Sequence, residues 1–166
     1  MEAADKITLV SSDKQKFEIS AKAAKRSVVI NKMIEDFAEQ TEFPINNVNA
    51  KNLGKITEYL KHYESTEPKP ISQPLPSKNF KDCVDDWTFG FLPDQLEDVF
   101  DLFQGANFMD IQPLMELMAA KIANVISNKT ADEIRSTFNI SNDFTKEEER
   151  QMLDEDKWKV EEVEEN

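Results

Sequence analysis

The side chains that most often carry out catalysis are scarce in this chain of 166 residues. It contains one histidine, His62, and one cysteine, Cys83, and no motif places them together. A thiol nucleophile needs an adjacent base to activate it. A lone histidine in the run Leu60-Lys61-His62-Tyr63, near a predicted helix end, is far more often structural than a ligand. We therefore expect a non-catalytic protein, not an enzyme.

Motifs for cofactors and metal ions are also missing from the sequence. Only three glycines occur, Gly54, Gly90 and Gly105, so no glycine-rich loop that could hold a phosphate can be written. The acidic run Asp154-Glu155-Asp156 lacks the spacing and the central glycine of a calcium loop. A single cysteine forms neither a disulfide framework nor a thiolate cluster. The sequence predicts no cofactor and no bound metal.

The charge balance restricts the class of partner. Thirty-three acidic and twenty basic residues give a formal net charge of −13, which argues against nucleic acid as a partner because phosphate binding requires clustered Lys and Arg. The acidity is explained by a well-solvated surface or by steering of a basic partner. No apolar run is long enough for a membrane span, and the start Met1–Lys6 does not resemble a signal peptide. A single cysteine suits a reducing compartment, and we expect a protein of the cytoplasm and nucleus.

The first third of the chain alternates between strand and helix patterns. Ile7, Leu9, Phe17 and Ile19 fall at alternating positions around a turn-like run and predict an antiparallel hairpin with one buried face. Short helices broken near Ser27 are expected next. Their apolar positions are Val28, Val29, Met33, Ile34 and Phe37.

A third strand and a longer helix follow. Phe43-Pro44-Ile45 predicts a short strand at a sheet edge, where a proline is tolerated. A helix is expected from Asn49 or Ala50 to about Tyr63, since apolar residues recur there at helical spacing. Early strands with helices indicate an α+β fold.

A proline-rich segment then separates two parts of the chain. Residues 64–78 hold four of the seven prolines, and proline fixes φ and removes a hydrogen-bond donor. The segment is predicted to be an extended, mobile linker.

The remainder of the chain is predicted to be helical. Three runs resemble capping boxes: Asp94-Gln95-Leu96-Glu97, Thr130-Ala131-Asp132-Glu133 and Thr145-Lys146-Glu147-Glu148. Between the first two, Ile111–Ile126 predicts a strongly apolar helix that is buried on several sides, with Pro113 in its first turn.

Apolar residues are in surplus near the C-terminus. Two short helices carry Phe138, Ile140, Phe144, Met152, Leu153 and Trp158. One neighbouring helix cannot easily cover all of them, and exposed apolar patches usually mark protein-binding surfaces. The residues alone leave a second interpretation open, in which these side chains simply complete the core.

Several stretches of the sequence resemble the Skp-one family. The densest is Asp132–Glu149, DEIRSTFNISNDFTKEEE; upstream are Gly105–Ile111, GANFMDI, and Lys121–Ile126, KIANVI. Shorter similarities lie at Ser11-Ser12-Asp13 with Phe17-Glu18, at Met33–Asp36 and at Asn47–Ala50. The resemblance runs from about Ile7 to Trp158 and is patchier before Ala106.

This resemblance implies an α+β fold of the BTB/POZ type with a C-terminal helical extension. The implied organisation is an N-terminal part of the BTB/POZ domain (1–63), a linker (64–86), the helical remainder of that domain (87–127), F-box-binding helices (128–160) and an acidic tail (161–166). It also implies the function of a non-catalytic adaptor in an SCF-type cullin-RING ubiquitin ligase, which bridges F-box substrate receptors and the cullin scaffold.

Two binding surfaces are carried over from the family by matching positions. The residues expected to contact the cullin N-terminal domain are Phe103, Asn107 and Phe108. Those expected to contact F-box proteins are Val125, Ile126, Phe138, Asn139, Ile140, Asn142, Asp143 and Trp158. Without an F-box partner, weak homodimers are expected.

The sequence departs from the family pattern mainly in its N-terminal half. Phe108 stands where the family usually has tyrosine, Lys146 where some members carry a hydroxylated proline, and the acidic insertion is reduced to Ala38–Glu42. This drift leaves an alternative open: a structural subunit that binds F-box-like proteins in a complex that is not a ligase.

Overall fold

The computed structural model describes residues 6–127 and 129–152. They belong to two compact units that divide after residue 128, and each unit is described by itself. In residues 6–127 and 129–152, no helix is both long and apolar enough to cross a membrane. The same residues contain no group of three His, Cys, Asp or Glu side chains that could hold a metal ion.

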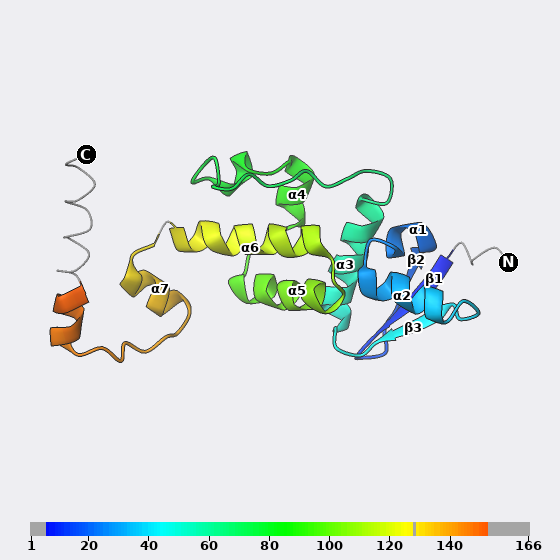
Figure 1. The fold of residues 1–166 in the computed structure, drawn as a ribbon, viewed down its shortest axis with the longest axis horizontal. Helices are drawn as coiled ribbons and strands as arrows, with labels where there is room; N and C mark the ends of the chain where they lie inside the picture. The colour runs from blue at the N-terminus through cyan, green and yellow to red at the C-terminus, as the bar shows by residue number, and fades with distance from the viewer. Residues whose placement is uncertain (1–5, 128, 153–166) are drawn as a thin grey trace. The chain divides into compact units, whose positions relative to one another are not determined.

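The first unit begins with a small mixed sheet (Figure 1). Its strands are β1 (Lys6–Ser11), β2 (Lys16–Ser20) and β3 (Glu42–Ile45), in the order β2-β1-β3. The central residue Leu9 pairs with Phe17 of antiparallel β2 and with Phe43 of parallel β3. The predicted hairpin and its buried face are confirmed, because Ile7, Leu9 and Ile19 are almost fully buried. Pro44 lies in an edge strand, as expected.

Two short helices connect β2 to β3, and their break at Ser27 is as predicted. These helices are α1 (Ala21–Ala24) and α2 (Val28–Asp36). The Ser27 hydroxyl accepts the backbone N–H of Ile30 at 3.2 Å, which caps α2, and donates to the Met109 carbonyl at 2.5 Å. Because Ser27 is fully buried, one side chain both starts the helix and fastens it to a distant part of the chain.

Only part of the set of apolar residues named for this stretch is covered by the fold. Ile30, which that set omitted, is the fully buried residue of the helix, whereas Val28 and Phe37 are 58% and 52% exposed. One side of a nine-residue helix cannot cover residues on every side of its axis.

The longer helices α3 (Ala50–His62) and α5 (Leu96–Phe108) form the centre of the first unit. Asn49 caps α3 by accepting the Asn52 N–H at 2.9 Å, and the helix starts where the sequence predicted. A Cβ at Gly105 would lie 3.0 Å from the Ile56 side chain, so this glycine permits a close approach of the two helices. The capping box predicted at Asp94–Glu97 is not formed, because α5 begins after Gln95 and has no side-chain cap.

Helix α6 (Gln112–Ser127) packs beside α5 (Figure 1). Pro113 lies in its first turn, and Leu114, Leu117 and Met118 are buried. Farther along, Val125 is half-buried and Ile126 is exposed. The expectation of a helix buried on several sides is thus correct only for its first half, within the part of the chain that the structure describes.

The proline-rich segment contains neither helix nor strand over residues 64–79 and bends at several points. Contacts attach it to the first unit: the Arg26 guanidinium donates to both carboxylate oxygens of Glu67 at 3.0 Å, and Ile71 and Leu75 pack against the core. The predicted linker continued to residue 86, but a 3₁₀ turn, η1 (Phe80–Asp82), lies inside it and Phe80 is buried. Helix α4 (Asp86–Phe91) begins at its end.

The second unit contains two short helical segments within its described residues. Helix α7 (Ala131–Thr137) opens with a complete capping box between Thr130 and Glu133. Residues 146–152 are also helical. The second and third predicted capping boxes are both present, and no residue of α7 is buried.

Candidate partner-binding surfaces

The three residues predicted to contact a cullin lie on α5. The helix turns Leu102 and Ala106 into the core, which leaves Asn107 and Phe108 at the surface and Phe103 partly packed against the core. Phe108 is 36% exposed. We refer to Phe103, Asn107 and Phe108 as the α5 surface. An aromatic ring and an amide on a rigid helix suit recognition of another protein.

An exposed residue that the sequence prediction missed lies beside the end of α5. The backbone N–H of Val28 donates to the Asp110 carbonyl at 3.3 Å, and Ser27 holds the Met109 carbonyl. These bonds keep the exposed Val28 next to the end of the α5 surface. The only sequence signal for it is that the stretch 21–37 has more apolar residues than one helix face can bury.

The C-terminal turn of α6 carries two of the positions predicted to contact F-box proteins. Val125 is half-buried and Ile126 is 36% exposed. Asn124, on the same turn, donates from Nδ2 to the Lys78 carbonyl at 2.9 Å, which attaches the helix to the segment after the prolines. The first unit thus presents a small apolar area where the helix leaves the core.

Helix α7 ends in a Schellman motif built around Asn139. The Ile140 N–H donates to the Arg135 carbonyl at 2.8 Å, and the Asn139 N–H to the Ser136 carbonyl at 3.4 Å. Asn139 has φ of 52°, in the left-handed region where asparagine is tolerated better than most residues. Asn139 was predicted only as an F-box contact, but it also sets the backbone turn that presents Ile140.

Both helical segments of the second unit begin with reciprocal caps. The Thr130 N–H donates to Glu133 Oε2 at 2.7 Å, and the Thr145 N–H donates to Glu148 Oε2 at 2.8 Å. These backbone hydrogen bonds, with help from the threonine hydroxyls, lower the pKa of both glutamates below the usual value of 4.5. The carboxylates therefore remain ionised and hold the helix starts at neutral pH.

Polar contacts link the two helical segments of this unit. Asn142 Nδ2 donates to Glu149 Oε1 at 2.5 Å, and the Arg135 guanidinium lies 3.9 Å from the same carboxylate. Arg135 also pairs with Asp132 at 2.9 Å. Asn142 further accepts the Phe144 N–H at 3.2 Å. These exposed polar bonds shape the loop 139–145, with Asp143 exposed upon it.

Apolar side chains of the second unit are exposed. Ile140, Phe144 and Met152 are 56%, 43% and 45% exposed, and Phe138 is half-buried. Not one residue of the range 129–152 is buried. A helical unit normally buries an apolar stripe to be stable, so this part of the chain is suited to packing against another protein.

The predicted F-box residues are divided between the two units. Val125 and Ile126 belong to the first unit, whereas Phe138, Asn139, Ile140, Asn142 and Asp143 belong to the second. Trp158 lies outside the described residues. Phe144 and Met152 were part of the predicted apolar surplus but not of the predicted site, and both are exposed.

Comparison with known proteins gives matches along nearly the whole chain. Residues 5–65 match the model described as Skp1 family, tetramerisation domain, and residues 112–159 match that described as Skp1 family, dimerisation domain. An S-phase kinase-associated protein 1 homolog of Tetrahymena thermophila is 42% identical over 92% of this chain and 93% of its own. The chain belongs to the Skp1 family.

Other relatives come from fungi and plants. The E3 ubiquitin ligase complex SCF subunit sconC of Arthroderma otae is 38% identical over 94% of this chain and 95% of its own. SKP1-like protein 12 of Arabidopsis thaliana is also 38% identical, over 93% of this chain and 97% of its own. The α+β fold and the family resemblance expected from the sequence are confirmed.

The two regions matched to the Skp1 family contain the candidate surfaces unequally. Every position predicted to contact an F-box protein, from Val125 to Trp158, lies within the second matched region, 112–159. The α5 surface lies between the two matched regions. Membership of the Skp1 family therefore bears more directly on the F-box set than on the cullin set.

Proposed function

We propose that this Skp1-family chain is a non-catalytic adaptor subunit of an SCF-type cullin-RING ubiquitin ligase. It would bind an F-box substrate receptor through its C-terminal helices and a cullin through its POZ domain. Relatives that match more than nine-tenths of the chain are named as SCF subunits. An adaptor accelerates ubiquitin transfer by raising effective concentration and requires no reactive side chain of its own.

The observation that carries this proposal is the exposed apolar set of the second unit. Ile140, Phe144 and Met152 remain exposed, although folding normally covers side chains of this size. An amphipathic helix from a partner would cover them, and burial of apolar area would supply most of the affinity. The Schellman turn at Asn139 and the two capping boxes hold these side chains in place before binding, which reduces the ordering cost.

The α5 surface supports the second half of the proposal. Asn107 and Phe108 are exposed on a helix whose opposite side is fixed in the core, so they can contact a partner without rearrangement. A phenylalanine at position 108 offers apolar contact and no hydroxyl. We therefore expect the affinity for a cullin to depend on ring packing at this position.

A reconstitution experiment tests both halves. The purified chain is mixed with an F-box protein and a cullin N-terminal domain, and the complexes are separated by size-exclusion chromatography. Formation of the ternary complex is expected, and Asn107→Ala combined with Phe108→Ala should remove the cullin and retain the F-box protein. If the unaltered chain binds F-box proteins but never a cullin, the alternative of a non-ligase subunit is favoured. If it binds neither, the proposal is wrong.

Two further properties follow from the proposed role. Without an F-box protein, the exposed apolar side chains would pair with those of a second copy, and sedimentation velocity should detect weak dimers that dissociate when an F-box protein is added. We also propose that the protein works in the cytoplasm and the nucleus. Fluorescence imaging of the tagged protein in cells tests this, and exclusion from both compartments would contradict it.

A further inference from the structure

The last turn of α6 buries a polar residue and exposes an apolar one. Asn124 is 9% exposed, whereas Ile126 is 36% exposed. Polar side chains are usually the exposed ones, and a buried amide is normally hydrogen-bonded. The Asn124 amide donates from Nδ2 to the Lys78 carbonyl at 2.9 Å. The polar residue of this turn therefore attaches the helix to another segment, and the apolar residue remains available to a partner.

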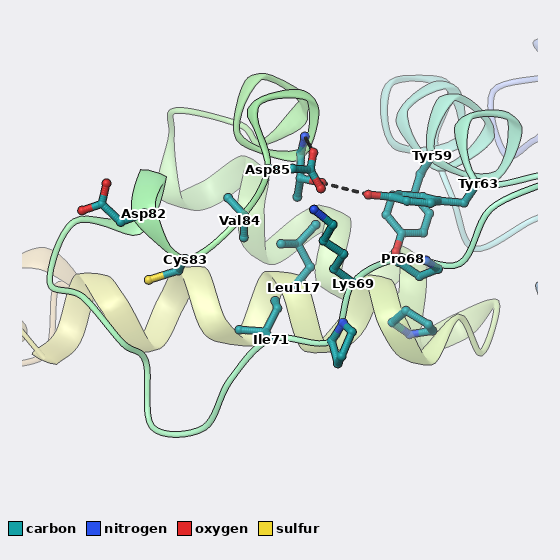
Figure 2. A pocket seen from close by; sticks show the side chains of 13 residues that line it. Tyr59, Tyr63, Pro68, Lys69, Ile71, Asp82, Cys83, Val84, Asp85 and Leu117 are labelled. Atoms are coloured by element: carbon teal, nitrogen blue, oxygen red, sulfur yellow. Dashed lines mark hydrogen bonds between the residues drawn. The ribbon is translucent and has the colours of Figure 1, made fainter.

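The segment that Asn124 contacts is a compact turn, residues 77–83, which we call the brace. Ser77 Oγ donates to Asp82 Oδ2 at 3.0 Å, and the Cys83 thiol donates to the Ser77 carbonyl over 3.5 Å. Figure 2 shows Asp82 and Cys83 beside α6, where they line, together with segment 68–71, a cavity of about 250 Å³. Because the brace is held by its own hydrogen bonds, it can serve as a fixed support for the helix.

A second contact joins the brace to α6 one turn before Asn124. Lys121 Nζ lies 5.5 Å from the centroid of the Phe80 ring, which is a cation–π contact. Phe80 itself is buried in the core. Lys121 and Asn124 are three residues apart and so lie on the same face of the helix. The brace therefore contacts α6 at two successive positions on one face.

These contacts act on a part of a helix that is ordinarily weak. The last four carbonyls of an α-helix have no intrahelical donors, so the final turn frays unless other groups hold it. In α6 the Ser127 hydroxyl donates to the Asn124 carbonyl at 3.1 Å, and the Asn124 side chain holds the brace. Val125 and Ile126 belong to this turn, and a frayed turn would not present them at helical spacing. The brace thus stabilises the geometry of two predicted F-box contacts.

We infer that the brace and the F-box surface are coupled through Asn124. Closure of the brace on α6 fixes the turn that presents Val125 and Ile126, and an F-box protein bound to these residues stabilises the closed brace in return, because coupling between two sites is reciprocal. Asn124 is a positioning residue for F-box binding. The inference rests on the proposed function, since it takes an F-box protein as the partner of this turn.

The labelling rate of one thiol tests the coupling. Cys83 is the only cysteine of the chain and belongs to the brace, so its reaction with the thiol reagent DTNB reports opening of the brace. Asn124→Ala should speed this reaction in the free chain about threefold to tenfold, because one hydrogen bond of ordinary strength is lost. Amide hydrogen exchange at Val125 and Ile126 should accelerate by a similar factor.

Addition of a saturating F-box protein supplies the second half of the test. Labelling of Cys83 in the unaltered chain should slow by about fivefold or more, the lower end of ordinary coupling between sites. In Asn124→Ala the same addition should have little effect, because the brace and the last turn of α6 are no longer joined. A merely structural role of Asn124 would not change the response to the partner.

Two further variants complete the experiment. Arg26→Gln is the control: it removes the Arg26–Glu67 ion pair at the other end of the proline-rich segment and should change neither the labelling of Cys83 nor its response to an F-box protein. Lys121→Gln serves in case the first variant does not fold. It removes the charge above the Phe80 ring and should speed labelling about twofold to fivefold. Urea denaturation shows which variants are folded.

Three results would overturn the inference. Unchanged labelling and amide exchange in both Asn124→Ala and Lys121→Gln would mean that the brace does not hold the turn. Equal slowing by an F-box protein in the unaltered chain and in Asn124→Ala would mean that the partner shields the thiol directly. If the unaltered chain binds no F-box protein, the proposed function and the coupling both fail; the first two results leave F-box binding intact, so the failures are distinguishable.

Discussion

Replacement of Ile140 by aspartate should weaken F-box binding severely while the protein stays folded. Ile140 follows the left-handed Asn139 and is 56% exposed. Full burial of an isoleucine side chain is worth about 1.5–3 kcal/mol, so the exposed half has about 0.8–1.7 kcal/mol still to gain in a complex. Ile140→Ala should therefore weaken binding roughly fourfold to twentyfold.

The aspartate adds a second penalty. A carboxylate left unpaired in an apolar contact costs about 1–3 kcal/mol or more, which brings the expected loss to about 2–5 kcal/mol. Affinity for an F-box protein should then fall at least about 30-fold. The free energy of unfolding should change by less than about 0.5 kcal/mol, because the side chain is mostly exposed in the free chain.

Isothermal titration calorimetry with a purified F-box protein measures this loss, and urea denaturation measures folding. Val28→Asp is the matched control: it introduces the same charge at an apolar residue of similar exposure, 58%, in the first unit. F-box affinity should be unchanged in that variant. Equal affinity of Ile140→Asp and the unaltered chain would refute the assignment of Ile140, and equal loss in both variants would point to a general charge effect.

Three other predictions concern the elements that position the surfaces. Ser27→Ala should lower the free energy of unfolding in urea by about 2–4 kcal/mol, because the cap of α2 is lost and the Met109 carbonyl is left without its donor; a loss below 0.5 kcal/mol would contradict this. Asn139→Ala should destabilise the left-handed turn that ends α7 by about 1–2 kcal/mol, whereas Asn139→Gly should not. NMR helicity of α7 measures this, and equal effects of the two substitutions would exclude a role for Asn139 in setting the backbone turn. The lowered pKa of Glu133 and Glu148 means that their caps stabilise the helices above the ordinary value of 4.5 and are lost as pH falls through the lowered one. Carbon chemical shifts should show α7 fraying on acidification, and a Glu133→Gln, Glu148→Gln variant should respond less.

Local sequence signals predicted those parts of the fold that local interactions determine. The hairpin follows from alternation around a turn, and the helix break at Ser27 and the start of α3 at Asn49 follow from residues that cap helices. The capping boxes at Thr130 and Thr145 were found for the same reason. In each case the partners lie within a few residues, so the sequence contains the whole interaction.

Features that depend on distant contacts were not predicted. The Asp94–Glu97 run has the residue types and spacing of a capping box. Helix α5 nevertheless starts after Gln95, so the box does not form. Phe80 lies in a stretch expected to be linker, but it is buried in the core. Ile30 and Val28 are adjacent to similar residues in the sequence, and only the packing of α2 decides which is covered.

The candidate sites divide in the same way. The F-box set came from a dense family resemblance, and the exposure of Ile140 agrees with the predicted apolar surplus. The cavity beneath segment 68–71 had no signal at all in the sequence. Tyr59 looks like an ordinary core residue of α3, and that it lines a pocket with segment 68–71 becomes evident only in the structure.

We propose that an F-box protein covers the exposed apolar side chains of the second unit. A crystal structure of this chain with an F-box protein measures their exposed fractions directly. We predict that Ile140, Phe144 and Met152, 43–56% exposed in the free chain, become buried against partner helices. A complex in which all three stay exposed, with the F-box protein seated elsewhere, would contradict it.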